Sequence, residues 1–174
     1  MKDLNFKREV VTLFLLVGFY SLCLGQSAAT WTKFDWLMGE WVGEGTGQPG
    51  QGNGAFSFKP DLDNSILVRK SHSTYPKAGN KPEITHDDLM VIYPDFSGAT
   101  TKAIYFDNEG HTINYTVECS ENTIVLTGNK IPGIPVFRLT YTLLDNKMVN
   151  TKFEMSRDGD TFITYVEGKS RKVN

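Results

Sequence analysis

From residue 39 onward, hydrophobic and polar residues alternate along most of the chain, and this period of two is typical of β-strands. The segments 111–119, 136–144 and 147–157 show the alternation most clearly. Successive side chains of a strand point to opposite faces, so each segment has one apolar and one polar face. The pattern predicts ten strands, at 39–46, 54–60, 65–74, 84–93, 99–107, 111–119, 122–128, 136–144, 147–157 and 161–171.

Turn-forming residues separate these segments. The tetrapeptides at 107–110 and 157–160 are rich in Asp, Asn and Gly, the residues that tight turns prefer. No helix of crossover length lies between the strands, so the expected topology is a meander of hairpins. Closing such a sheet on itself removes both exposed edges. We therefore predict an all-β fold, a ten-stranded antiparallel up-and-down barrel.

A short helical segment is expected just before the first strand. Trp31, Phe34 and Leu37 recur at helical spacing and give one apolar face to one or two turns. This segment is predicted to cover one end of the barrel.

The N-terminal region has the features of an export signal. Positively charged residues within 2–8 precede an almost unbroken apolar run at 10–24, and the small residue Gly25 follows. We expect a signal peptide at 1–25 and a single domain at 26–174, located in the periplasm or secreted and without a membrane span after cleavage. A retained signal anchor is the alternative, although the run is shorter than the roughly 20 residues that cross a bilayer.

Charge and cysteine content exclude some partners and cross-links. The formal net charge is −2 with both signs dispersed, and no basic run tracks a phosphate backbone, so nucleic acid is not an expected partner. Cys23 leaves with the signal peptide, which leaves Cys119 alone and without an internal disulfide. The oligomeric state stays open.

Catalytic and metal-binding motifs are absent from the sequence. His72, His86 and His111 have neither the spacing nor the cysteine partners of a zinc site. The triplet 86–88 is the most ligand-rich stretch, and a solvated loop is its simpler explanation, although a metal site assembled across strands stays open. No Gly-x-Ser-x-Gly sequence is present, so we predict no catalytic residue and no cofactor.

The segment 34–47, Phe-Asp-Trp-Leu-Met-Gly-Glu-Trp-Val-Gly-Glu-Gly-Thr-Gly, resembles the opening of nitrobindin-like and related lipocalin-like β-barrel proteins. The resemblance implies a short helix leading into a ten-stranded barrel with an internal cavity. Heme-binding members carry a proximal histidine on the final strand, where this chain has Tyr165, and no histidine follows His111. Heme is therefore disfavoured, and an exported lipocalin-like domain is the nearer likeness.

We predict that the barrel binds a small apolar or amphipathic molecule, because an apolar interior with few polar groups is a common ligand site. The candidate lining residues are Trp41, His111, Tyr115, Phe137, Tyr141, Phe153 and Tyr165. Core packing explains each of them equally well. Two alternatives stay open: an enzyme of the cyclase or hydrolase type that uses a tyrosine or histidine in the barrel, and an envelope protein-interaction module with a filled interior.

Overall fold

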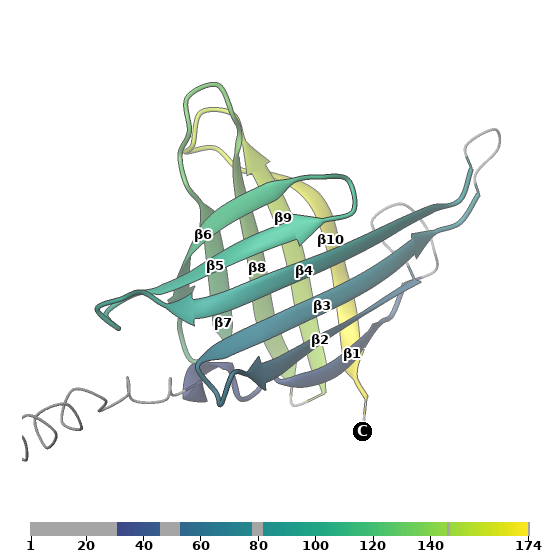
Figure 1. The fold of residues 1–174 in the computed structure, drawn as a ribbon. Coiled ribbons are helices and arrows are strands. Elements are labelled where there is room, and N and C mark those ends of the chain that lie inside the picture. The colour runs from purple at the N-terminus through teal and green to yellow at the C-terminus, as the bar shows by residue number, and fades with distance from the viewer. Residues whose placement is uncertain (1–30, 46–52, 78–81, 146, 174) are drawn as a thin grey trace, which may run out of the picture.

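The computed structural model describes residues 31–45, 53–77, 82–145 and 147–173, and these form one closed antiparallel barrel (Figure 1). Each strand pairs with its neighbours in the chain, and β1 pairs with β10 to close the sheet. The strands are β1 (Gly39–Gly43), β2 (Asn53–Asp61), β3 (Ile66–Tyr75), β4 (Ile84–Pro94), β5 (Thr101–Asp107), β6 (Thr112–Cys119), β7 (Thr123–Gly128), β8 (Val136–Asp145), β9 (Met148–Ser156) and β10 (Ile163–Lys172). The prediction of an all-β, ten-stranded antiparallel barrel is confirmed.

The segment before β1 is a single 3-10 turn, Thr32–Phe34, and the described residues contain no α-helix. The prediction of a helix is therefore met only by this shorter turn. Strand β1 begins at Gly39 with a φ of 108°. Short helical pieces of this kind commonly take the 3-10 form. The indole of Trp31 donates a hydrogen bond to the carbonyl of Asn64 at 2.9 Å, which ties the turn to the loop between β2 and β3.

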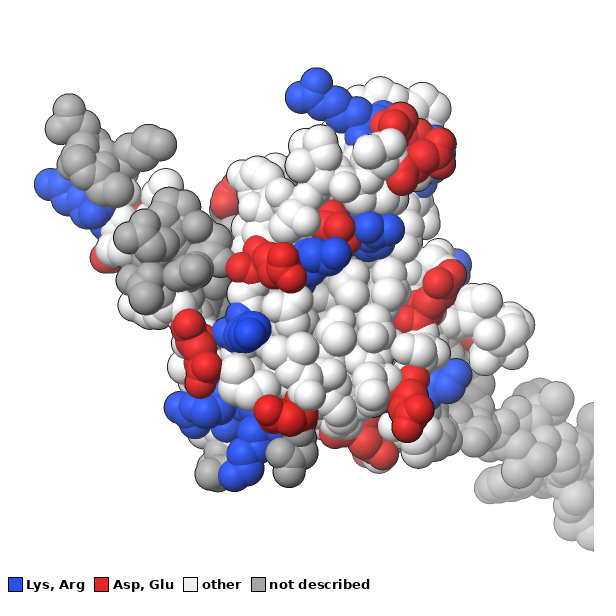
Figure 2. Space-filling view, turned by 180° about the vertical axis from the view of Figure 1, so that it is seen from behind, with Lys and Arg blue, Asp and Glu red and all other residues white. Residues whose placement is uncertain are grey.

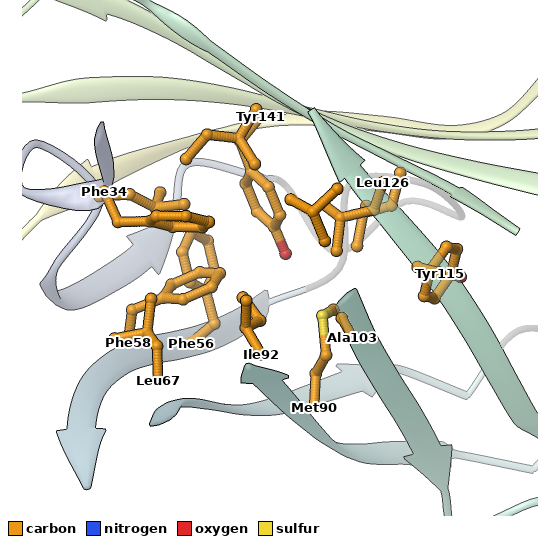
Figure 3. Packing of buried hydrophobic residues seen from close by; sticks show 14 of the residues in the cluster. Phe34, Phe56, Phe58, Leu67, Met90, Ile92, Ala103, Tyr115, Leu126 and Tyr141 are labelled. Carbon is orange, nitrogen blue, oxygen red and sulfur yellow. The ribbon is translucent and has the colours of Figure 1, made fainter. Parts of the chain in front are cut away.

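Apolar side chains fill the end of the barrel next to this turn, which we call the closed end (Figure 3). Trp41 stacks on Phe56 with ring centroids 6.1 Å apart, and Tyr141 meets Phe58 edge to face at 5.3 Å. Burial and close packing of apolar side chains are a main source of stability in such a barrel. The buried apolar residues of this cluster are Trp31, Phe34, Leu37, Trp41, Phe56, Phe58, Leu67, Met90, Ile92, Ala103, Tyr115, Val117, Ile124, Leu126, Leu139, Tyr141 and Val149.

A β-bulge interrupts the pairing of β10 with β9. Thr164 faces Glu154 and Val166 faces Phe153, so Tyr165 is the extra residue between them. A bulge breaks the alternation of faces along its strand. This explains why the sequence of the last strand does not show which of its residues face inward.

The outer surface carries both signs of charge, interspersed over the face shown in Figure 2. None of the helices in the described ranges is long and apolar enough to cross a membrane. The predicted signal peptide at 1–25 lies outside the described residues.

Candidate functional site

A buried ion pair lies inside the barrel wall, between neighbouring strands β3 and β4. Arg69 faces Met90 and Asp88 faces Ser71 across this pair of strands, so all four residues share the inward face. The guanidinium of Arg69 contacts the carboxylate of Asp88, and their side chains are only 8% and 6% exposed. Burial raises the pKa of Asp88 above its usual value, while the neighbouring Arg69 opposes this rise. Taking two charges out of water costs several kcal/mol per ion, so a buried pair needs good geometry to be tolerated.

Three tyrosines from three other strands surround this ion pair: Tyr105 on β5, Tyr115 on β6 and Tyr141 on β8. The guanidinium of Arg69 lies 5.6 Å from the ring centroid of Phe56, which packs against Tyr141 at 5.8 Å. Burial raises the pKa of Tyr141 to about 12 and raises those of Tyr105 and Tyr115 still further above their usual range. At neutral pH all three phenols therefore stay protonated and can donate hydrogen bonds.

Several buried polar atoms have no hydrogen-bond partner, and three of them belong to the polar layer, our name for the Arg69–Asp88 pair, the tyrosines around it and Thr151. By strict hydrogen-bond geometry these atoms in the described part of the chain are Nε of Arg69, Oη of Tyr141 and Oγ1 of Thr151, with a fourth, Nε1 of Trp36, at the closed end. Arg69 nevertheless lies close enough to Tyr141 to act on the pKa of its hydroxyl through a side-chain hydrogen bond. Tyr141 and Thr151 face each other across β8 and β9. Figure 3 shows the Tyr141 hydroxyl directed into the interior of the barrel. Buried polar groups in native proteins are nearly always paired with protein atoms, ordered water or a ligand, so these three inward-facing atoms mark positions where a bound polar group could pair.

A series of hydrogen-bonded side chains connects the rim of the barrel to the ion pair. Nδ1 of His86 lies 3.0 Å from the Glu109 carboxylate, and Nε2 lies 2.9 Å from Oη of Tyr105. Because a carboxylate only accepts, Nδ1 of His86 donates to Glu109, while the Tyr105 hydroxyl lies within hydrogen-bond distance of both Nε2 and the Asp107 carboxylate. Oη of Tyr105 also lies 3.3 Å from Oδ2 of Asp107, and Nε2 of His86 lies 3.8 Å from Oδ2 of Asp88. This chain connects a solvent-exposed carboxylate to buried groups.

The end opposite the closed end, which we call the open end, has aromatic walls. Phe137 on β8 and Phe153 on β9 stack with centroids 5.6 Å apart, and Tyr165 meets Phe153 edge to face at 6.3 Å. Inward-facing residues on this side, such as Ser73 and Ile113, remain partly exposed, whereas Leu67 and Ile92 near the 3-10 turn are fully buried. The interior is therefore more accessible from the open end.

Three of the predicted lining residues lie deep in the barrel. Trp41 and Tyr141 are 0% exposed and Tyr115 is 2% exposed, as expected from their place in the alternation. Tyr115 and Tyr141 come together near Arg69, whereas Trp41 belongs to the packed core of the closed end.

The other four predicted residues lie toward the open end or outside the barrel. Phe137 and Phe153 are partly buried against the core. Tyr165 is 74% exposed because it occupies the bulge. The His111 side chain is 63% exposed and its Nδ1 contacts Asp107 at 2.8 Å, so it does not join the buried polar layer.

Sequence reasoning missed the polar members of the interior: Arg69, Asp88, Thr151, His86 and Tyr105. The signal was available, because Leu67, Arg69 and Ser71 alternate on one face, but an arginine on an inward face is unusual enough to be placed outward by default. The triplet 86–88 is also not a solvated loop. It lies within β4, and His86 and Asp88 are on its inward face. No group of three or more potential metal ligands is assembled within the described residues.

A shallow depression of about 490 Å³ lies on the outer face of β1 to β4. Its walls include the outward-facing residues Val42, Ala55, Lys70, His72 and Asp87. It is open to solvent, and its lining also includes Trp41, Phe56, Ser71 and Asp88, which are inward-facing residues.

Comparison with protein-family models and with curated protein sequences gave no match. A closed ten-stranded barrel does not by itself distinguish among barrel families. The resemblance to lipocalin-like and nitrobindin-like proteins therefore stays a prediction.

Proposed function

We propose that this protein binds a small amphipathic molecule, which enters through the open end and places its polar group against Arg69, Tyr141 and Thr151. The observation that carries the proposal is the set of unpaired polar atoms on these three side chains, next to an apolar closed end. We further propose that the protein acts outside the cytoplasm, on the basis of the predicted signal peptide.

The energetic argument rests on the cost of leaving such atoms unpaired. Each buried donor or acceptor without a partner costs about 1–3 kcal/mol relative to its hydrated state. A ligand oxygen that accepts from Arg69 and pairs with one hydroxyl recovers part of that cost on binding. A ligand that pairs with these atoms therefore gains binding free energy at a site that is already organised.

The open end supplies the matching apolar surface. The stacked rings of Phe137 and Phe153 and the nearby ring of Tyr165 offer flat aromatic walls between the polar layer and solvent. Such walls suit an alkyl or ring body whose head points toward Arg69. Small-molecule sites commonly combine apolar walls with a few placed polar groups in this way.

Calorimetric titration with three decyl compounds, decan-1-ol, decanoate and decylammonium, tests the proposal on the wild-type protein and on inward-facing variants. Tyr141→Phe and Thr151→Val each remove one unpaired hydroxyl and should weaken binding of the best ligand about fivefold to tenfold. Removing a hydroxyl that has no partner should leave the unliganded protein as stable as before or up to about 1 kcal/mol more stable.

Matched controls come from the outward faces of the same barrel. Tyr93→Phe on β4 and Thr142→Val on β8 make the same chemical changes at positions next to inward-facing residues. They should leave affinity unchanged. The proposal fails if no decyl compound binds, or if the inward-facing and outward-facing variants bind alike.

The hydrogen-bonded chain from Glu109 through His86 to Tyr105 favours a second candidate, an enzyme of the hydrolase or cyclase type. Burial keeps the Tyr105 phenol protonated, so it can donate a hydrogen bond to the developing oxyanion of an ester, and His86 holds the phenol in position. Release of p-nitrophenol from p-nitrophenyl decanoate tests this candidate. Loss of turnover in Tyr105→Phe, with decyl-ligand affinity retained, would support it, and equal turnover in both proteins would exclude it.

A further inference from the structure

The charges inside the barrel restrict the polar end of the ligand, and we infer that it is an uncharged oxygen, a hydroxyl or a carbonyl, and neither a carboxylate nor an ammonium. This inference rests on the proposed function and specifies its ligand class. It follows from the charges around Arg69 and from the kinds of hydrogen bond that the unpaired atoms can make.

A carboxylate is disfavoured because the positive charge of Arg69 is already matched. Asp88 contacts the guanidinium, and both side chains are more than nine-tenths buried. Asp107 faces Asp88 across β4 and β5, and its side chain is 4% exposed. With one buried positive and two buried negative groups, the layer has a formal charge of −1 when His86 is neutral. An anionic head group would add a further negative charge in a poorly solvated position.

An ammonium is disfavoured by the type of hydrogen bond on offer. Nε of Arg69 is a donor and requires an acceptor, and an ammonium has none. The head group must therefore accept at least one hydrogen bond without bringing a charge.

An uncharged oxygen meets every requirement. It accepts from Nε of Arg69 with one lone pair and from the hydroxyl of Tyr141 or Thr151 with the other. A hydroxyl head group can in addition donate to one of these side chains. The Arg69–Asp88 pair then acts as a positioned dipole that orients the ligand, while its charge stays balanced by Asp88.

The three decyl compounds separate the possibilities because they share one alkyl chain. At neutral pH we expect decan-1-ol to bind at least about tenfold more tightly than decanoate or decylammonium. Asp107→Asn removes one buried negative charge outside the ion pair, and its side-chain oxygen can still accept from the backbone N–H groups of Glu109 and His111. In this variant the difference in affinity between decan-1-ol and decanoate should be smaller than in the wild type.

Each outcome has one meaning. Tighter binding of decan-1-ol by the wild type, with a smaller difference in affinity in Asp107→Asn, supports the inference. Equal or tighter binding of decanoate or decylammonium, with sensitivity to Tyr141→Phe retained, overturns the head-group inference and leaves the proposed binding function standing. An absence of binding by all three compounds overturns both.

Discussion

Replacement of Trp41 by alanine should be among the most destabilising single changes in this protein. Trp41 is 0% exposed, its ring stacks on Phe56, and its indole N–H donates to the carbonyl of Leu37 at 2.8 Å. The Nζ of Lys172 lies 5.3 Å from the ring centroid on the neighbouring strand. The side chain therefore joins β1 to β2, to β10 and to the turn at the closed end.

The expected magnitude follows from packing and from one hydrogen bond. Truncation of a buried tryptophan to alanine costs about 3–5 kcal/mol in unfolding free energy. Trp41→Phe keeps an aromatic ring but leaves the Leu37 carbonyl without its donor, and should cost about 1–2 kcal/mol. At a urea dependence of about 2 kcal/mol/M, a loss of 4 kcal/mol lowers the urea midpoint by about 2 M.

Urea unfolding followed by far-UV circular dichroism measures this loss without relying on the tryptophan signal. Phe96→Ala is the matched control, because this ring is 97% exposed and its removal should change the unfolding free energy by less than about 0.5 kcal/mol. A loss below about 1 kcal/mol in Trp41→Ala would refute the reasoning. It would mean that the indole fills no tightly packed space.

Three further predictions concern pH, heme and the N-terminus. Hydrogen bonds from the Thr100 and Ser97 hydroxyls lower the pKa of Asp95 to about 2, so its contribution to stability is present above about pH 4 and is lost as the pH falls toward 2. At about pH 5, Asp95→Asn should therefore have a lower urea midpoint than the wild type. A difference between the two midpoints that does not shrink at about pH 3 would contradict this. Hemin titration followed by absorbance should show no nitrogen-ligated spectrum, because both ring nitrogens of His86 contact other side chains and the other two histidines are exposed. A tyrosinate spectrum that is lost in Tyr165→Phe would instead identify that residue as a heme ligand. N-terminal sequencing of the native protein should begin at or near Gln26, and an intact Met1 would disprove cleavage.

The alternation of side chains was sufficient to predict the barrel, because period two and turn residues are local properties of the sequence. Strand β6 shows this clearly: Ile113, Tyr115 and Val117 were expected on one face, and cross-strand pairing places them on the inward face. Local pattern failed at Tyr165, where a bulge adds one residue and breaks the alternation. A bulge depends on pairing with the neighbouring strand, which the sequence of one strand does not encode.

The candidate site was predicted in its apolar part and missed in its polar part. Tyr115 and Tyr141 were expected inside because aromatic residues at alternating positions commonly face the core. Arg69 and Asp88 were not, since a charged residue is normally buried only with a partner, and here the partner lies 19 residues away on the next strand. Such pairs emerge only when the register between strands is known.

A crystal structure of the protein grown with decan-1-ol tests the central claim most directly. The account predicts density for the alcohol in the barrel interior, with its oxygen within about 3.5 Å of Nε of Arg69 and of the hydroxyl of Tyr141 or Thr151, and its alkyl chain extending toward Phe153 at the open end. A packed interior in which ordered water completes all three polar groups would contradict the account and favour a protein-interaction module. So would density for the alcohol only in the depression on the outer face of β1 to β4.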